Sequence, residues 1–146
     1  MNNKKMQLAH ILLVEDNEGD ILLTLEAFEE CKIKTEISVA KNGKEALDFL
    51  FNRGAFIDAK KPDLILLDIN IPIFNGHEVL RQIKSDSILK KIPVIMLTTS
   101  SHQKDLDDAY ANHCNSYVRK PLEISEFLTA IQKIEGFWLQ LNTLSN

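Results

Sequence analysis

The sequence predicts an α/β fold: a single doubly wound sheet of five parallel strands with five helices on its faces. Short apolar runs alternate five times with amphipathic stretches of helical length, which is the pattern of β-α units. Four consecutive large apolar residues at 64–67 indicate a strand covered on both faces, as in parallel sheets. Polar residues follow the apolar runs, at the sheet edge where such folds place their sites.

The first two units lie in the N-terminal third. The apolar segment 10–14 is expected to be the first strand. A helix follows it, because apolar residues recur at helical spacing at Ile21, Leu22, Leu25 and Phe28. The second strand is expected at 36–40, and a helix that opens with Asn-Gly at 42–51.

The other three units repeat this order after a polar connection at 53–62. Strands are expected at 63–68, 92–100 and 116–121, and helices at 75–86, at 103–113 and from about Glu123 onward. The last helix has a core-facing stripe with spacings of four, three, four and three, formed by Phe127, Ile131, Ile134, Trp138 and Leu141. Leu128, Phe137 and Leu139 lie off this stripe and predict a second apolar face for a partner.

Composition narrows the class of protein. A chain of 146 residues predicts one domain over 1–146, with a helical extension from about 136. A net charge of −4 and a pI near 5.6 argue against nucleic-acid and anionic-membrane partners. No apolar stretch reaches the roughly 20 residues of a membrane span, and no signal-peptide core is seen. We expect a cytoplasmic protein in which Cys31 and Cys114 are reduced.

Charged and hydroxyl side chains stand where the predicted strands end. The residues are Glu15 and Asp16 after the first strand, Asp68 after the third, Thr98 and Thr99 at the fourth and Lys120 at the fifth. In a parallel sheet they converge, and carboxylates that meet in one pocket repel one another. A hard divalent cation such as Mg²⁺ relieves that repulsion. A carboxylate beside the cation can attack a phosphoryl group, and an ammonium and a hydroxyl can hold the phosphoryl oxygens.

Four motifs in this order resemble the receiver domain of response regulators, the phosphorylated half of two-component signalling. They are LVED (13–16), LILLDINIP (64–72) with NG (75–76), PVIMLTTS (93–100) and YVRKP (117–121). The resemblance covers about residues 9–135 and implies a flavodoxin-like fold with strand order 2-1-3-4-5. The ending and the long loop before the third strand further resemble small stand-alone regulators that partner bacterial phytochromes and similar sensor kinases.

The resemblance implies a role for each matching residue. Asp68 would be the phosphoacceptor, Thr98 the switch hydroxyl and Tyr117 the switch aromatic. Lys120 would contact the phosphoryl group, and the Lys120–Pro121 bond would be cis. Mg²⁺, or Mn²⁺ in its place, would be bound by Asp16, by Asp68 and by the backbone carbonyl of Asn70, with Glu15 acting mainly through a bound water.

For each residue taken alone, a purely structural role stays open. Glu15 and Asp16 could cap the first helix, Thr98 and Thr99 are good strand formers, and Tyr117 could be a half-buried strand aromatic. Many receivers have alanine or glycine where this chain has Thr99, so the pocket mouth could be crowded. Only the whole set of convergent residues favours function.

We expect a signalling switch and no enzyme. A sensor histidine kinase would donate the phosphoryl group, the downstream protein is not indicated, and a homodimer would form through the fourth helix, fifth strand and fifth helix. Two alternatives remain: a metal-dependent aspartyl phosphohydrolase and a purely structural interaction module. Such hydrolases commonly carry a general-acid Asp two residues after the nucleophile, where this chain has Asn70.

Overall fold

The computed structural model describes residues 8–121 and 123–141 and has the predicted architecture. Its strands are β1 (Ala9–Val14), β2 (Thr35–Ala40), β3 (Leu64–Leu67), β4 (Val94–Thr98) and β5 (Ser116–Arg119). They form one parallel sheet in the order β2-β1-β3-β4-β5, which confirms the predicted fold class.

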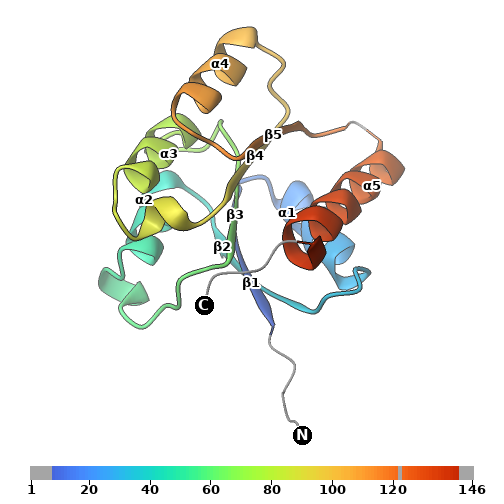
Figure 1. Ribbon diagram of the computed structural model, residues 1–146, viewed down its shortest axis with the longest axis horizontal. Coiled ribbons are helices and arrows are strands. Elements are labelled where there is room, and N and C mark those ends of the chain that lie inside the picture. The colour runs from blue at the N-terminus through green and yellow to red at the C-terminus, as the bar shows by residue number, and fades with distance from the viewer. Residues whose placement is uncertain (1–7, 122, 142–146) are drawn as a thin grey trace, which may run out of the picture.

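Helices cover both faces of the sheet (Figure 1). They are α1 (Glu18–Glu29), α2 (Gly43–Leu50), α3 (Gly76–Lys84), α4 (Gln103–Ala111) and α5 (Ile124–Ile134). In Figure 1, α1 and α5 lie on one side of the sheet and α2, α3 and α4 on the other. The core is therefore split into two clusters, one on each face.

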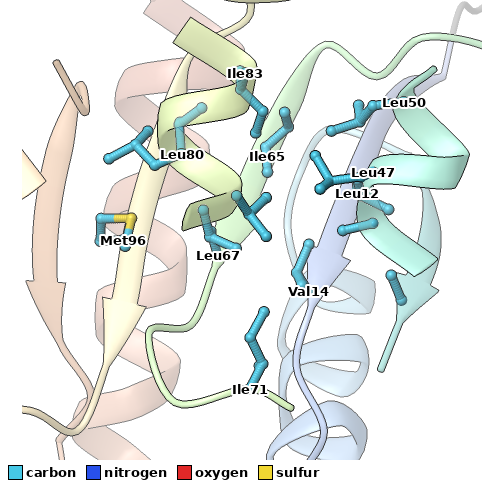
Figure 2. Close-up of a cluster of buried hydrophobic side chains, with 14 of the residues drawn as sticks. Leu12, Val14, Leu47, Leu50, Ile65, Leu67, Ile71, Leu80, Ile83 and Met96 are labelled. Atoms are coloured by element: carbon cyan, nitrogen blue, oxygen red, sulfur yellow. The ribbon is translucent and has the colours of Figure 1, made fainter. Parts of the chain in front are cut away.

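Side chains of the central strands alternate between these clusters. Leu12, Ile65 and Met96 pack toward α2 and α3, as Figure 2 shows for that cluster. Their neighbours Ile11 and Leu66 belong to the cluster under α1 and α5. Because both faces are covered, every position of such a strand must be apolar, which explains the unbroken run at 64–67.

Asparagine begins three of the helices. Asn17, Asn42 and Asn75 each accept a hydrogen bond from the backbone N–H three residues later, and Asn75 completes a capping box with Glu78. These caps fix the point at which the chain leaves the site and enters the helix. The loops after β1 and β3 are thereby held at the carboxyl edge of the sheet.

The C-terminal helix departs from the predicted period. After Ile134 the chain continues as a π-helix over Glu135–Leu141, in which each turn takes more residues than in an α-helix. Leu139 is consequently buried, although the spacing placed it on the outer face, while Phe137 is 53% exposed. Leu141 was predicted to face the core, but its side chain is not among those that the structure describes.

Two further observations bear on the sequence-based expectations. Among the described residues, no helix has the length and apolar content needed to cross a bilayer. Cys31 and Cys114 form no disulfide, and burial raises the pKa of each thiol to about 11.

Candidate functional site

Three carboxylates converge at the carboxyl edge of the sheet. β1 and β3 are paired in register at Val14 and Leu67, so the residues that follow them emerge side by side. One oxygen each of Glu15, Asp16 and Asp68 lies within 4.8 Å of the others. Glu15 and Asp68 are buried, whereas Asp16 faces solvent. The structure thus brings together the acids that the sequence singled out.

A buried ammonium lies among these acids. Lys120 follows β5, and its Nζ donates a short hydrogen bond to Oε1 of Glu15. The same Nζ lies 2.9 Å from Oδ2 of Asp20 and 3.6 Å from Oδ2 of Asp68. Burial disfavours the charge on Lys120, but the hydrogen bonds to Glu15 and Asp20 and the charge of Asp68 raise its pKa overall. The ammonium is therefore hydrogen-bonded to Glu15 and Asp20 and lies close to Asp68.

One ammonium does not balance this set of acids. Burial raises the pKa of Glu15 to about 7, and Asp68 adds to the rise while Lys120 opposes it. An all-oxygen donor set at a sheet edge, with one exposed carboxylate, fits a hard divalent cation. The chemistry of the donors therefore fits a divalent-metal site.

Backbone contacts orient Asp68. Its N–H donates to the carbonyl of Val14 at 3.1 Å, and its Oδ1 accepts from the N–H of Ile69 at 2.7 Å. Oδ2 is the oxygen that faces Lys120. One carboxylate oxygen is thus fixed by the backbone and the other points into the pocket. Asn70 lies two residues beyond, and its role as a metal ligand stays a prediction.

The two predicted switch residues meet at a third residue, Ser100. Thr98 is fully buried, and its Oγ1 accepts from the N–H of Ser100 at 3.3 Å. The hydroxyl of Tyr117 donates to the carbonyl of Ser100 at 3.2 Å. Ser100 Oγ in turn donates to Asp105 of α4 at 2.5 Å. Thr99 is exposed and lies outside these contacts.

Sequence reasoning missed Asp20, Ser100 and Asp105. Asp20 has the pattern of an ordinary acid in the first turn of a helix, and no motif links it to Lys120. Ser100 and Asp105 belong to a loop and a polar helix whose placement depends on tertiary contacts. The signal that could have indicated Asp20 was its place in the first turn of the helix that begins directly after the acidic pair Glu15 and Asp16.

The prediction of a cis peptide bond between Lys120 and Pro121 is wrong. The structure has no cis peptide bond in residues 8–121 and 123–141, so this bond is trans. Trans is the lower-energy form even before proline, by about 0.5–1 kcal/mol.

Comparisons with known proteins agree with the geometry. A family model described as the response regulator receiver domain matches residues 11–132. The response regulator Rcp1 of Synechocystis is 40% identical over 134 residues, which are 92% of this chain and 91% of that protein.

Two solved structures are similar over nearly the whole chain. The phosphorylated cyanobacterial phytochrome response regulator RcpA has a TM-score of 0.93 and 41% identity, covering 96% of this chain and all of that one (100%). The Mn²⁺-bound form of Rcp1 has a TM-score of 0.90 and 38% identity, covering 94% of this chain and 99% of that one.

Proposed function

We propose, from the premise that this chain belongs to the response regulator receiver domain family, that it is a signalling switch phosphorylated on Asp68. One observation supports this most directly. Oδ2 of Asp68 lies 3.6 Å from the buried ammonium of Lys120, and a carboxylate oxygen of Asp68 lies within 4.8 Å of oxygens of Glu15 and Asp16. Such a site can neutralise the charge that a phosphoryl group brings.

Asp16 and Asp68 would hold the metal directly, with the backbone carbonyl of Asn70, and Glu15 would act mainly through a bound water. Mg²⁺ is the expected ion, and Mn²⁺ is an alternative because a relative was crystallised with it. When bound, the ion supplies positive charge to both the attacking carboxylate and the phosphoryl oxygens.

Transfer needs little more than positioning. The Oδ2 atom of Asp68 attacks phosphorus, and the bond from phosphorus to the histidine nitrogen of the donor breaks. The electron pair of that bond leaves with the imidazole, which takes up a proton, and an acyl phosphate remains on Asp68. Lys120 and Thr98 would hold phosphoryl oxygens. Thr98 would then give up the hydrogen bond that its hydroxyl oxygen accepts from the N–H of Ser100.

The partners follow from the same reasoning. A sensor histidine kinase would donate the phosphoryl group, and the similarity to a phytochrome response regulator favours a phytochrome-like kinase. Phosphorylation would shift an equilibrium between conformations and so change a protein-binding surface. The net charge of −4 favours protein partners over nucleic acid or anionic membranes. A cytoplasmic location is part of the same proposal.

We also infer a homodimer through α4, β5 and α5. β5 is an edge strand, and a groove of about 650 Å³ lies between it and α5. Its apolar lining includes Val118, Pro121, Ala130, Ile134, Phe137 and Trp138. Glu126 and Lys133 lie at the same groove, so a two-fold copy would meet both an apolar surface and a charge of each sign.

Labelling with acetyl phosphate tests the phosphoacceptor. Intact-mass spectrometry should show one added phosphate on the parent protein only when Mg²⁺ is present. Asp68→Asn should abolish the label, while Asp58→Asn, which removes an exposed carboxylate outside the site, should leave it unchanged. A phosphate mapped to another residue would contradict the proposal.

A magnesium titration followed by NMR tests the metal ligands. Asp16→Asn should weaken binding, because it removes a direct ligand and one negative charge. Glu18→Gln also removes a carboxylate near the start of α1 but one that pairs with Lys41, and it should bind as the parent does. Equal affinity of Asp16→Asn and the parent would remove Asp16 from the ligand set.

A turnover assay on small phosphoesters addresses the phosphohydrolase alternative. We expect no turnover beyond the slow loss of phosphate from Asp68 itself, because Asn70 stands where a general acid would be needed. Sustained release of phosphate from added esters would favour the enzyme.

A further inference from the structure

Lys120 has a partner outside the set of strand-end residues. Its Nζ is 2.9 Å from Oδ2 of Asp20, which belongs to the first turn of α1, but 3.6 Å from Asp68. The ammonium is therefore hydrogen-bonded on the α1 side of the pocket and lies just beyond hydrogen-bond distance of the proposed acceptor. We propose that Asp20 is a positioning residue that holds Lys120 on the α1 side and competes with a phosphoryl group on Asp68 for this ammonium.

Local contacts fix the backbone of Asp20. Its N–H donates to Oδ1 of the helix cap Asn17 at 2.9 Å, and its carbonyl accepts from the hydroxyl of Thr24 at 2.7 Å. The carboxylate therefore projects from a rigid helix start toward Lys120. Because Asp16 and Asn17 directly precede this turn, the same segment carries the proposed metal ligand and the partner of Lys120.

The two hydrogen-bonded partners of Lys120 differ in exposure. The side chain of Glu15 is 4% exposed, whereas that of Asp20 is 33% exposed. Water can replace Lys120 at Asp20 at little cost, but it cannot easily do so at Glu15. Asp20 is accordingly the partner that Lys120 can leave when the charge at Asp68 changes.

Phosphorylation changes that charge in the required direction. The carboxylate of Asp68 carries one negative charge, and a phosphoryl group in its place carries about −1.5 to −2. The attraction of Lys120 toward Asp68 then rises, while its attraction toward Asp20 stays the same. This inference rests on the proposed function: Asp20 would lower the affinity of the site for a phosphoryl group and for its mimics.

A simpler role for Asp20 is to complement the positive end of α1. An acid in the first turn of a helix is stabilising whatever it contacts. Glu18 lies in the same turn and provides the same charge, but it pairs with the exposed Lys41. Glu18→Gln is therefore the matched control, since it removes first-turn charge and leaves Lys120 untouched.

Beryllofluoride titrations in saturating Mg²⁺, followed by NMR, test the proposal. Asp20→Asn should bind this phosphoryl mimic about two- to fivefold more tightly, the range that a partly exposed ion pair would supply. Asp20→Glu should return the affinity toward that of the parent, and Glu18→Gln should leave it unchanged. In a Lys120→Gln background, Asp20→Asn should have no effect, because the ammonium for which Asp20 competes is gone.

The outcomes separate the two proposals. A parent protein that binds no beryllofluoride would overturn the proposed function, and this inference with it. A parent that binds it with the same affinity as Asp20→Asn would overturn the inference alone. Equal shifts in Asp20→Asn and Glu18→Gln, or a shift that persists without Lys120, would reduce Asp20 to a helix-end charge.

Discussion

Two glycines let backbone segments approach one another beside the candidate site. A Cβ on Gly76 would lie 2.3 Å from the carbonyl oxygen of Asp68, and one on Gly43 would lie 2.1 Å from that of Phe74. Neither distance is possible for a real side chain, so α3 and α2 could not keep their positions with any other residue there. The Asn-Gly pair at 75–76 thus provides a cap and a close approach in two residues.

Gly76→Ala should test this packing. We expect a loss of about 1–3 kcal/mol in the free energy of unfolding, because the methyl group must displace the backbone of Asp68. Weaker Mg²⁺ binding should accompany the loss. Gly136→Ala is the control, since a Cβ there meets nothing within 4 Å. Urea unfolding of both variants measures the difference, and equal stabilities would contradict the packing argument.

The residues of the site differ in how far the sequence could predict them. Asp68 and Lys120 stand directly after strands, and parallel strands must bring such residues together. Asp20 and Ser100 were missed because their roles depend on which neighbours their side chains reach in the folded chain, and a first-turn acid or a loop serine has no sequence signal for such a contact. The predicted cis bond came from resemblance alone and had no support from neighbouring residues.

Among the helices, α4 is held mainly by polar contacts. Of its nine residues, all of them described, Ala109 is the buried one. At its first turn, Asp105 accepts from Ser100 at 2.5 Å and lies 3.0 Å from Nε2 of His77 in α3. The carboxylate of Asp105 thus links α4 to α3 and to the loop between β4 and α4 that Tyr117 contacts. Such a helix can shift without exposing much apolar surface.

Asp105→Asn should loosen α4. We expect faster hydrogen exchange across the helix and a loss of about 1 kcal/mol, the usual value of a hydrogen bond that is not fully buried. Asp107→Asn is the control, because Asp107 lies on the exposed face of α4 and accepts a hydrogen bond from the side chain of Gln103 in the same helix. Similar exchange rates in both variants would show that Asp105 does not anchor the helix.

The effect of Asp105→Asn should also depend on pH. The hydroxyl of Ser100, and then His77, lower the pKa of Asp105 below its ordinary 3.8. A lowered pKa means that the stabilisation by this carboxylate is complete above pH 3.8 and is lost as the pH falls through the lowered value. The difference between parent and variant should therefore persist at neutral pH and shrink in strong acid. Chemical denaturation at a series of pH values measures it, and a difference that grew on acidification would contradict this assignment.

The π-helix shows where sequence periodicity failed. The α-helical period placed Leu139 outside, because it assumes 3.6 residues per turn up to the end. The wider turns after Ile134 move the core-facing position on by one residue, from Trp138 to Leu139. Glu135, at the start of this segment, accepts from the N–H of Ile33 at 2.9 Å and so ties the segment to the loop after α1.

Leu139→Ala should therefore cost more stability than Phe137→Ala. Removing a side chain that is 5% exposed leaves a cavity, for which we expect about 2 kcal/mol or more. Phe137 is 53% exposed and packs edge-to-face on Trp138, so its loss should cost about 1 kcal/mol. Thermal unfolding of the two variants gives the order, and the reverse order would favour a continuous α-helix.

At the scale of the whole molecule, the proposed site lies at the carboxyl ends of the strands, and the proposed dimer surface lies along the edge strand β5. Thr98 and Tyr117 belong to β4 and β5, and the hydroxyl of Tyr117 reaches the loop that leads into α4. A phosphoryl group that draws on Thr98 would change its contact with Ser100 and thereby the contacts of α4. The groove between β5 and α5 shares strand β5 with this region, since Val118, which lines the groove, follows Tyr117. The state of Asp68 could in this way alter how two copies meet.

Sedimentation tests the dimer. The parent protein should associate, and beryllofluoride with Mg²⁺ should shift the equilibrium if the surface responds to the site. Phe137→Glu should weaken association, because it places a charge where an apolar anchor would be buried against a second copy. Leu139 is unsuitable for this test, since charging a buried residue would unfold the helix.

Ile57→Glu is the matched control: Ile57 is 66% exposed and belongs to the connection between α2 and β3, outside the groove. A parent that stays monomeric at high concentration, with and without beryllofluoride, would refute the dimer. If Ile57→Glu and Phe137→Glu weakened association equally, the groove would not be its interface.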